Sequence, residues 1–206
     1  MAVVSNGTTI IDAGALGSGV ATGKMTLIKT LTASGSGTLS FVDGAASVVL
    51  DNTYDSYVFK FINIHPSVGD LAGLTFQVST DGGSSYGIAI TSTYFRPTHN
   101  EDGGSAALVY QASQDLAQST AYQNITSGDG IENDESASGT LTIYNPSDTT
   151  FVKHFIANTN TYHGGDKTRN PFTAGYINST SAVDAIQFKY SSGNFDGVIK
   201  LYGIGG

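Results

Sequence analysis

The sequence contains no cysteine and no tryptophan, has only four prolines among its 206 residues, and is poor in charge. Without cysteine the chain can form no disulfide bond and offers no thiolate to a metal ion or to nucleophilic catalysis. Charged residues make up 13% of the chain, about half the share usual in a soluble domain. Solubility must therefore come largely from serine, threonine, asparagine and glycine.

Positive charge is also scarce. Nine lysines and arginines face 17 aspartates and glutamates, which gives a formal net charge of −8. Such a surface repels phosphate backbones and anionic lipid headgroups, so we expect neither nucleic acid nor membrane as a partner. No run approaches the ~18 apolar residues of a membrane-spanning helix. Residues 1–7 lack the basic and apolar regions of a signal peptide, so we predict no targeting segment.

Glycine, serine and threonine are abundant, with 73 of the 206 positions between them. Glycine is costly inside helices, and serine and threonine compete for the backbone hydrogen bonds of a helix. The remaining pattern consists of short alternating segments separated by turn residues, which predicts roughly ten to twelve strands. We therefore predict an all-β fold, an antiparallel β-sandwich or jelly roll.

Two segments give the most specific local predictions. Residues 54–64 form the longest apolar and aromatic run, and we expect a central strand covered on both faces. Residues 74–79 and 86–95 flank Asp81-Gly82-Gly83, whose glycines suit a tight turn, so we expect a hairpin there. Residues 113–121 tolerate a helical turn. The segments at 25–32, 38–41, 106–110, 139–144, 150–158, 171–178, 185–190 and 197–202 are predicted as further strands.

The front of the chain differs from the rest. Residues 1–23 are rich in glycine and sparse in apolar side chains, so we predict an extended N-terminal arm followed by a sandwich domain at 24–206. The arm would contact a neighbouring subunit, or else would be a frayed terminus or an edge strand of the domain. Its candidate anchoring residues are Ile10, Ile11, Leu16 and Val20.

Motifs for catalysis or cofactor binding are missing. There is no nucleophile elbow, no phosphate-binding loop and no His-Glu-x-x-His pair, and the four histidines are scattered along the sequence. We therefore predict no enzymatic activity, no catalytic residues, no cofactor and no metal site. The tyrosines near loops could anchor contacts, although a tyrosine in a strand more often fills the edge of a core.

Two acidic, glycine-containing segments, residues 96–105 and 127–138, are predicted as solvated loops. They could face a receptor. The oxygen-rich segment 129–135 also invites a calcium hypothesis, but its spacing misses the EF-hand pattern, which favours an ordinary charged loop. The candidate receptor-facing residues are His99, Asn100, Glu101, Asp102, Asp129, Glu132 and Asp134.

Four segments taken in order resemble small structural proteins of tailed bacteriophages, notably marine and cyanobacterial phages. They are residues 6–16 (NGTTIIDAGAL), 57–66 (YVFKFINIHP), 76–86 (FQVSTDGGSSY) and 197–204 (GVIKLYGI). The resemblance implies a virion protein built from β-sandwich modules and assembled as a homo-oligomer. It leaves open a tail fibre, a tail or baseplate accessory and a capsid decoration protein, and it carries over no catalytic residue.

Three functional hypotheses follow. The first is a structural virion component that docks on other virion proteins and on copies of itself, with a trimer expected. The second is a receptor- or glycan-binding tip that places tyrosines and both acidic loops at one exposed end. The third is a glycan hydrolase, against which the lack of any clustered acid pair argues.

Overall fold

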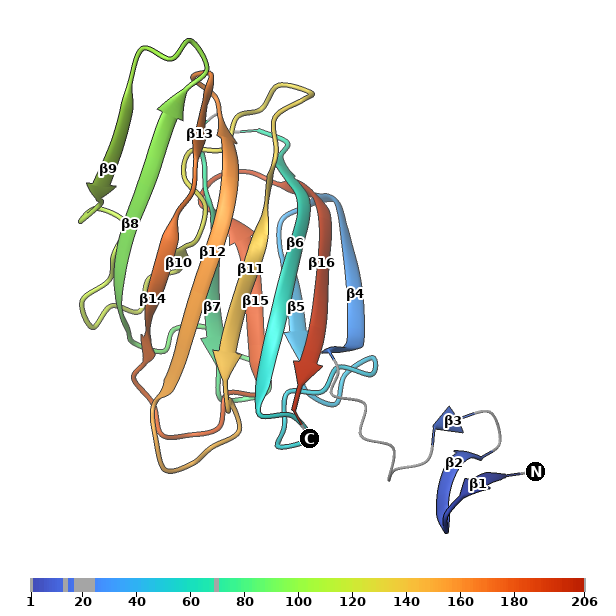
Figure 1. Cartoon of the computed structure of the whole chain (residues 1–206). Coiled ribbons are helices and arrows are strands. Elements are labelled where there is room, and N and C mark those ends of the chain that lie inside the picture. Colours follow the sequence, from blue (N-terminus) through green and yellow to red (C-terminus); the bar gives the residue numbers. More distant parts are fainter. Residues whose placement is uncertain (1, 13–14, 17–24, 69–70, 206) are drawn as a thin grey trace.

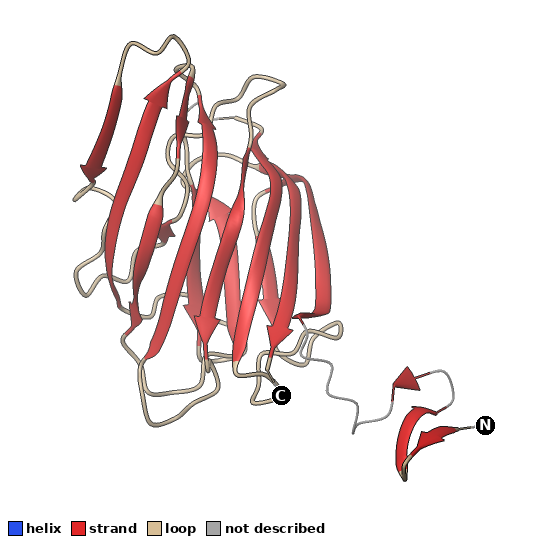
Figure 2. Ribbon diagram, in the orientation of Figure 1, coloured by secondary structure: helices blue, strands red, loops and turns tan. Residues whose placement is uncertain are grey.

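The computed structural model describes residues 2–12, 15–16, 25–68 and 71–205, and within them it contains strands and loops but no helix (Figure 2). Neighbouring strands pair antiparallel throughout the two main sheets. The predicted antiparallel β-sandwich is thus confirmed, whereas the finer jelly-roll topology is not confirmed. The helical turn considered at 113–121 does not form, because that segment consists of turns, bends and a bridge from Ser119 to Ile90.

From residue 25 onward the chain crosses several times between two layers. They are β1 (Val3–Ser5), β2 (Thr8–Asp12), β3 (Ala15–Leu16), β4 (Met25–Ser36), β5 (Leu39–Val42), β6 (Ser56–Pro66), β7 (Leu74–Ser79), β8 (Ile90–Asn100), β9 (Ala106–Tyr110), β10 (Gln123–Asn124), β11 (Ala137–Tyr144), β12 (Lys153–His163), β13 (Lys167–Arg169), β14 (Phe172–Ile177), β15 (Ala185–Tyr190) and β16 (Phe195–Ile204).

The two layers differ in size. The large sheet has nine strands in the order β13-β8-β14-β12-β11-β6-β16-β4, with β9 beside β8. The small sheet has four, in the order β10-β7-β15-β5. Figure 1 shows the small sheet covering only part of one face of the large sheet. The opposite face of the large sheet, called here the outer face, has no second layer over it among the described residues.

Aromatic side chains fill the space between the layers. Phe188 of β15 packs against Phe59 and Phe61 of β6, with both ring-centroid distances at 5.3 Å. Phe76 of β7 meets Phe155 of β12 at 5.0 Å. These phenylalanines are at most 3% exposed, and they hold the sheets together through apolar burial and edge-to-face packing.

The predicted hairpin is wrong. The turn forms as expected, with φ of +71° at Gly82 and +78° at Gly83. However, β7 pairs with β10 and β15 in the small sheet, while the chain beyond the turn crosses to the large sheet and becomes β8. Local turn chemistry is satisfied equally well by a hairpin and by a connection between layers.

The strand predicted at 54–64 is β6, and it lies centrally between β11 and β16. Its inward residues Tyr57, Phe59 and Phe61 are buried. On the other face Ile62 is 38% exposed, and Lys60 extends over the ring of Tyr202 with its Nζ 5.2 Å from the centroid. The expectation of cover on both faces is therefore wrong, because the outer face of the sheet meets solvent.

Candidate functional site

The strand β9 is an exposed edge of the large sheet. It pairs with β8, from Phe95 opposite Tyr110 to His99 opposite Ala106, and with no other strand of the described residues. All five of its residues are exposed, and Leu108 reaches 71%. The sequence Ala-Ala-Leu-Val-Tyr holds neither a charge nor a proline, the usual devices that protect a free edge. The edge is therefore open to pairing with another chain.

An aromatic row runs from this edge across the outer face. We define the row as Tyr110 of β9, Phe95 of β8 and Phe172 of β14, which are successive cross-strand partners. Phe95 and Phe172 are 40% and 37% exposed, and Tyr110 is 55% exposed. Large aromatic side chains that remain this open on adjacent strands form a contiguous apolar surface of the kind that marks interaction sites.

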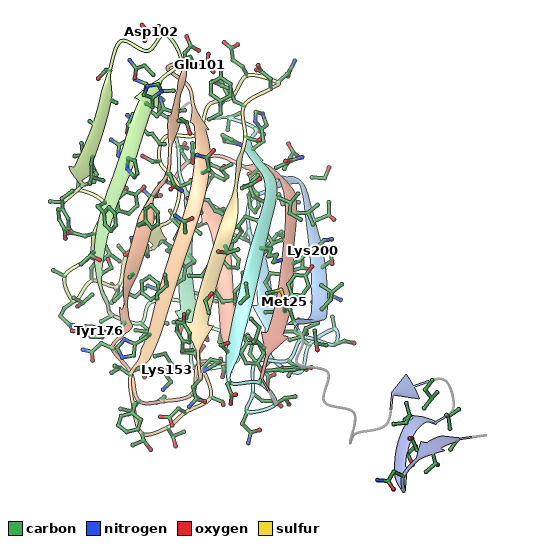
Figure 3. The ribbon with its side chains drawn as sticks, viewed as in Figure 1. Met25, Glu101, Asp102, Lys153, Tyr176 and Lys200 are labelled. Carbon is green, nitrogen blue, oxygen red and sulfur yellow. The ribbon has the colours of Figure 1, made fainter. Side chains whose placement is uncertain are left out.

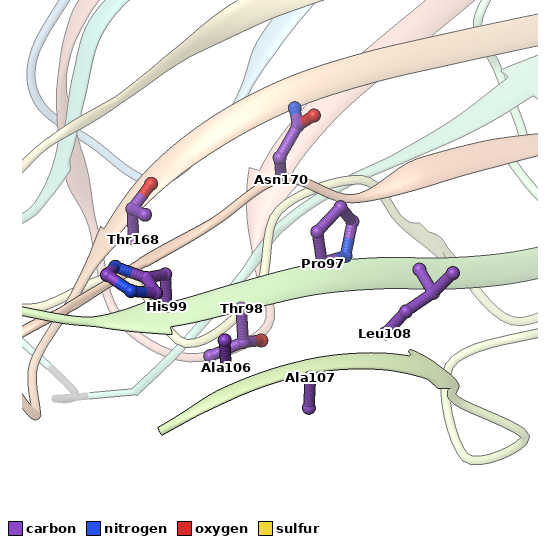
Figure 4. Close-up of a pocket in the computed structure, with 8 residues that line it drawn as sticks. All are labelled: Pro97, Thr98, His99, Ala106, Ala107, Leu108, Thr168 and Asn170. Carbon is purple, nitrogen blue, oxygen red and sulfur yellow. The ribbon is translucent and has the colours of Figure 1, made fainter. Parts of the chain in front are cut away.

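A shallow hollow of about 480 Å³ continues the aromatic row toward the end of the sheet (Figure 4). Pro97 and Leu108 face each other across β8 and β9 in the middle of it. Thr168 and Asn170 line its inner side, and His99 lies at its far end. The lining is mainly apolar and contains no carboxylate, so the hollow suits an apolar side chain better than a reacting substrate.

The two acidic segments do meet at one end of the sandwich, although less of them is loop than predicted. His99 and Asn100 belong to β8 and not to a loop. Glu101 and Asp102 form the turn that follows, and Figure 3 shows both at the tip of the molecule. Glu101 receives the hydrogen bond of the Tyr162 hydroxyl.

Tyr162 connects the two segments electrostatically. Its hydrogen bond to Glu101, partial burial and the negative charges of Glu101, Asp166 and Asp134 raise the pKa of Tyr162 to about 12. Glu132 and Asp134, in the loop between β10 and β11, are exposed. This end of the sandwich is thus an acidic rim around a tyrosine.

Asp129 is not a receptor-facing residue, and that prediction is wrong. The side chain is fully buried and accepts hydrogen bonds from Thr126 Oγ1 at 2.7 Å and from Tyr190 Oη at 2.6 Å. Burial raises the pKa of Asp129 to about 6, although these hydrogen bonds lower it. Its position after a glycine in an acidic run suggested solvent, but the backbone pairs with Ala72 and His163 and draws the residue inside.

The predicted arm contains local structure of its own. β1, β2 and β3 form a small separate sheet, which Figure 1 shows beside the sandwich and outside both layers. Ile10 is half-buried in β2, Ile11 is 39% exposed, and the backbone of Ile11 pairs with Leu16 of β3. Val20, and with it the proposed domain boundary at residue 23, lies outside the described residues.

No three histidine, aspartate or glutamate side chains of the described residues converge as a metal site would require. None of the described elements is a helix long and apolar enough to span a membrane.

The sequence predicted the strand at 106–110 but did not show that this strand, β9, lies at the edge of the sheet.

Comparison with known proteins adds no assignment. No family model matches the chain, and a search of curated proteins found no match to it.

Proposed function

We propose that this chain is a structural component of a tailed-bacteriophage virion, in a tail fibre, a tail accessory or a capsid decoration, and that it assembles as a homo-oligomer on other virion proteins. The observation that carries the proposal is the free edge of β9 continuous with the aromatic row. A monomer that kept this edge open would risk uncontrolled strand pairing. A closed oligomer, for which we propose a trimer, would cover it.

The test compares self-association of the wild type with that of Leu108→Asp by sedimentation velocity over a range of concentrations. Leu108 and Phe151 are both 71% exposed, but Phe151 lies in the loop before β12, so Phe151→Asp is a matched control. The wild type and Phe151→Asp should form the same defined oligomer, and Leu108→Asp should remain monomeric. A wild type that stays monomeric at high concentration would refute assembly.

The virion location needs a separate experiment. Cross-linking mass spectrometry of intact particles should connect this chain to other virion proteins and to second copies of itself. Particles that lack the chain altogether would refute the virion role even if the isolated protein forms oligomers.

A second candidate function, a receptor- or glycan-binding tip, is favoured by one observation. The β8–β9 turn and the loop between β10 and β11 flank Tyr162 at one end of the sandwich, with a hollow of about 250 Å³ lined by His99, Glu101, Tyr162 and Lys167. Adsorption of the purified protein to host cells, compared with that of Tyr162→Ala, tests this role. Equal adsorption by the two proteins, or none by the wild type, would exclude it.

A further inference from the structure

A polar cleft of about 500 Å³ opens between the two sheets, on the side of the sandwich away from the outer face. The large sheet contributes Arg96 of β8 and Arg169 of β13 to its lining. The opposite wall comes from the segments around β10, including Gln114, Asn124 and Thr126. A cleft of this volume is within the usual range for small-molecule sites.

The two arginines are only partly satisfied by the protein. Arg96 Nη2 donates to Gln111 Oε1 at 3.1 Å, and Arg169 Nη1 donates to the Ser127 carbonyl at 3.3 Å. The Nε and Nη1 of Arg96 and the Nε of Arg169 are buried without a hydrogen-bond partner. No carboxylate of the described residues lies within ion-pairing distance of either guanidinium group.

The guanidinium groups are also close enough to affect each other. Burial, followed by the positive charge of Arg96, lowers the pKa of Arg169 to about 10. Burial likewise lowers the pKa of Arg96. Two like charges that are partly removed from water and lack a counter-charge are costly, and an anion between them would offset both the repulsion and the lost hydration.

This arrangement stands out in a chain with a net charge of −8 and only nine lysines and arginines. Asp129, the nearest carboxyl in sequence to Thr126 and Ser127, is held by Thr126 and Tyr190 and does not pair with either arginine. The charge of the cleft is therefore available to a ligand.

The rest of the lining consists mainly of neutral hydrogen-bonding groups. Gln111, Ser113, Gln114, Asn124 and Ser191 present amides and hydroxyls to the cleft. The Oδ1 of Asn124 is buried and has no partner among the described residues. Amides and hydroxyls of this kind can both donate to and accept from a polyhydroxylated ligand, whereas a bare inorganic anion would use only the donors.

We propose that this cleft binds an acidic monosaccharide of the hexuronic acid class, with the sugar carboxylate between Arg96 and Arg169 and the hydroxyl groups on the amide-lined wall. Planar guanidinium groups match a carboxylate through paired N–H···O hydrogen bonds. The inference goes beyond the assembly role and does not depend on it, because the aromatic row lies on the outer face of the large sheet.

The experiment is isothermal titration calorimetry of the full chain at low ionic strength with three probes: galacturonate, galactose and inorganic phosphate. Galacturonate should bind saturably at one site, and galactose should not bind. Phosphate should compete with galacturonate, because it shares the oxyanion chemistry. Arg169→Gln should weaken galacturonate binding roughly tenfold or more. Lys200→Gln removes the same charge from the outer side of β16 and should leave the affinity for galacturonate unchanged.

A second readout does not depend on the variants folding. In the wild type, the Nε–Hε NMR signals of Arg96 and Arg169 should shift on galacturonate addition and saturate with the calorimetric constant. Equal binding of galactose and galacturonate, phosphate binding without galacturonate binding, or no binding of any probe would each overturn the proposal. The oligomeric state measured on the same samples keeps this result separate from the assembly role.

Discussion

Phe95 and Phe172 stack almost face to face on the outer face of the large sheet, with ring centroids 5.1 Å apart and ring planes 5° from parallel. Both rings remain more than a third exposed. The core phenylalanines, in contrast, meet mostly edge to face within closed surroundings. A parallel pair at the surface presents one broad apolar plane, which another subunit can cover.

The first prediction concerns that plane. Phe172→Ser should weaken self-association at least roughly tenfold, as truncation of a central aromatic contact commonly does, and should lower the thermal midpoint only about as much as a truncation at a similarly exposed position, because the ring is 37% exposed. Ile62→Ser, at a similar 38% exposure on β6, is the control for the rest of the outer face. Sedimentation and thermal denaturation measure the two effects. Unchanged association together with a large loss of stability would show that the pair serves only the fold.

A second prediction tests how closely β8 and β14 approach. A Cβ added at Gly175 would collide with the carbonyl oxygen of Thr91 and lie 2.8 Å from the Cα of Ser92. Gly175→Ala should therefore destabilise the protein by roughly 1–3 kcal/mol, as overpacking typically does. Gly87→Ala is the control, because nothing lies within 4 Å of its added Cβ and the residue is exposed. Urea denaturation should give a clearly lower free energy of unfolding for Gly175→Ala than for Gly87→Ala. Equal stability would contradict the close approach.

A third prediction concerns a buried cation. Lys153, at the end of the sandwich opposite Glu101 (Figure 3), is 1% exposed, and its ammonium group donates to the carbonyls of Phe151, Ser179 and Ser181. It thereby joins the start of β12 to the segment between β14 and β15. Lys153→Met keeps the volume but leaves these carbonyls without their donor, so stability should fall by roughly 1–3 kcal/mol.

The control for that loss is Lys200→Met, since Lys200 is only half-buried and makes no comparable hydrogen bonds in the described part of the chain. The free energy of unfolding of Lys200→Met should stay within about 0.5 kcal/mol of that of the wild type. Chemical denaturation at pH 7 gives both values. A Lys153→Met protein as stable as the wild type would show that the three carbonyls find other partners or water.

The all-β sandwich could be predicted from the sequence, because alternating polar and apolar residues mark each strand locally. Alternation along residues 74–79 and 185–190 predicts β7 and β15 with the observed bounds. Which sheet a strand joins is a long-range property, so the same alternation placed β7 and β8 in one hairpin although they lie in different sheets. The position of β9 at the edge was hidden for the same reason.

The burial of the polar groups could not be predicted from the sequence either. Lys153 and Asp129 look like surface residues in the sequence, because charged side chains are rarely buried. What draws each inward is a set of partners distant along the chain: the carbonyl of Ser181 for Lys153 and the hydroxyl of Tyr190 for Asp129. The convergence of Arg96 and Arg169 in one cleft depends likewise on the pairing of β8 with β13.

The last prediction follows from the buried carboxyl of Asp129. Its pKa is about 6 in the folded protein, against an ordinary value of 3.8. Between these values the native state binds more protons than the unfolded chain. The stabilising contribution is therefore complete below about pH 3.8 and is lost as the pH rises through 6. Two pKa units correspond to roughly 3 kcal/mol.

Asp129→Asn removes this dependence, because the amide keeps an acceptor oxygen for Thr126 and Tyr190 and has no charge to bury. The free energy of unfolding of the wild type should fall by up to roughly 3 kcal/mol relative to Asp129→Asn between pH 4 and 7. Asp81→Asn is the control, because the pKa of Asp81 is shifted in the opposite direction to that of Asp129. Hydrogen bonds from Ser79 and Ser85 lower the pKa of Asp81 to about 2, so its contribution is present above pH 3.8 and is lost only as the pH falls through 2. Denaturation at each pH measures the differences, and a constant gap between wild type and Asp129→Asn from pH 4 to 7 would contradict a carboxyl that is protonated on burial.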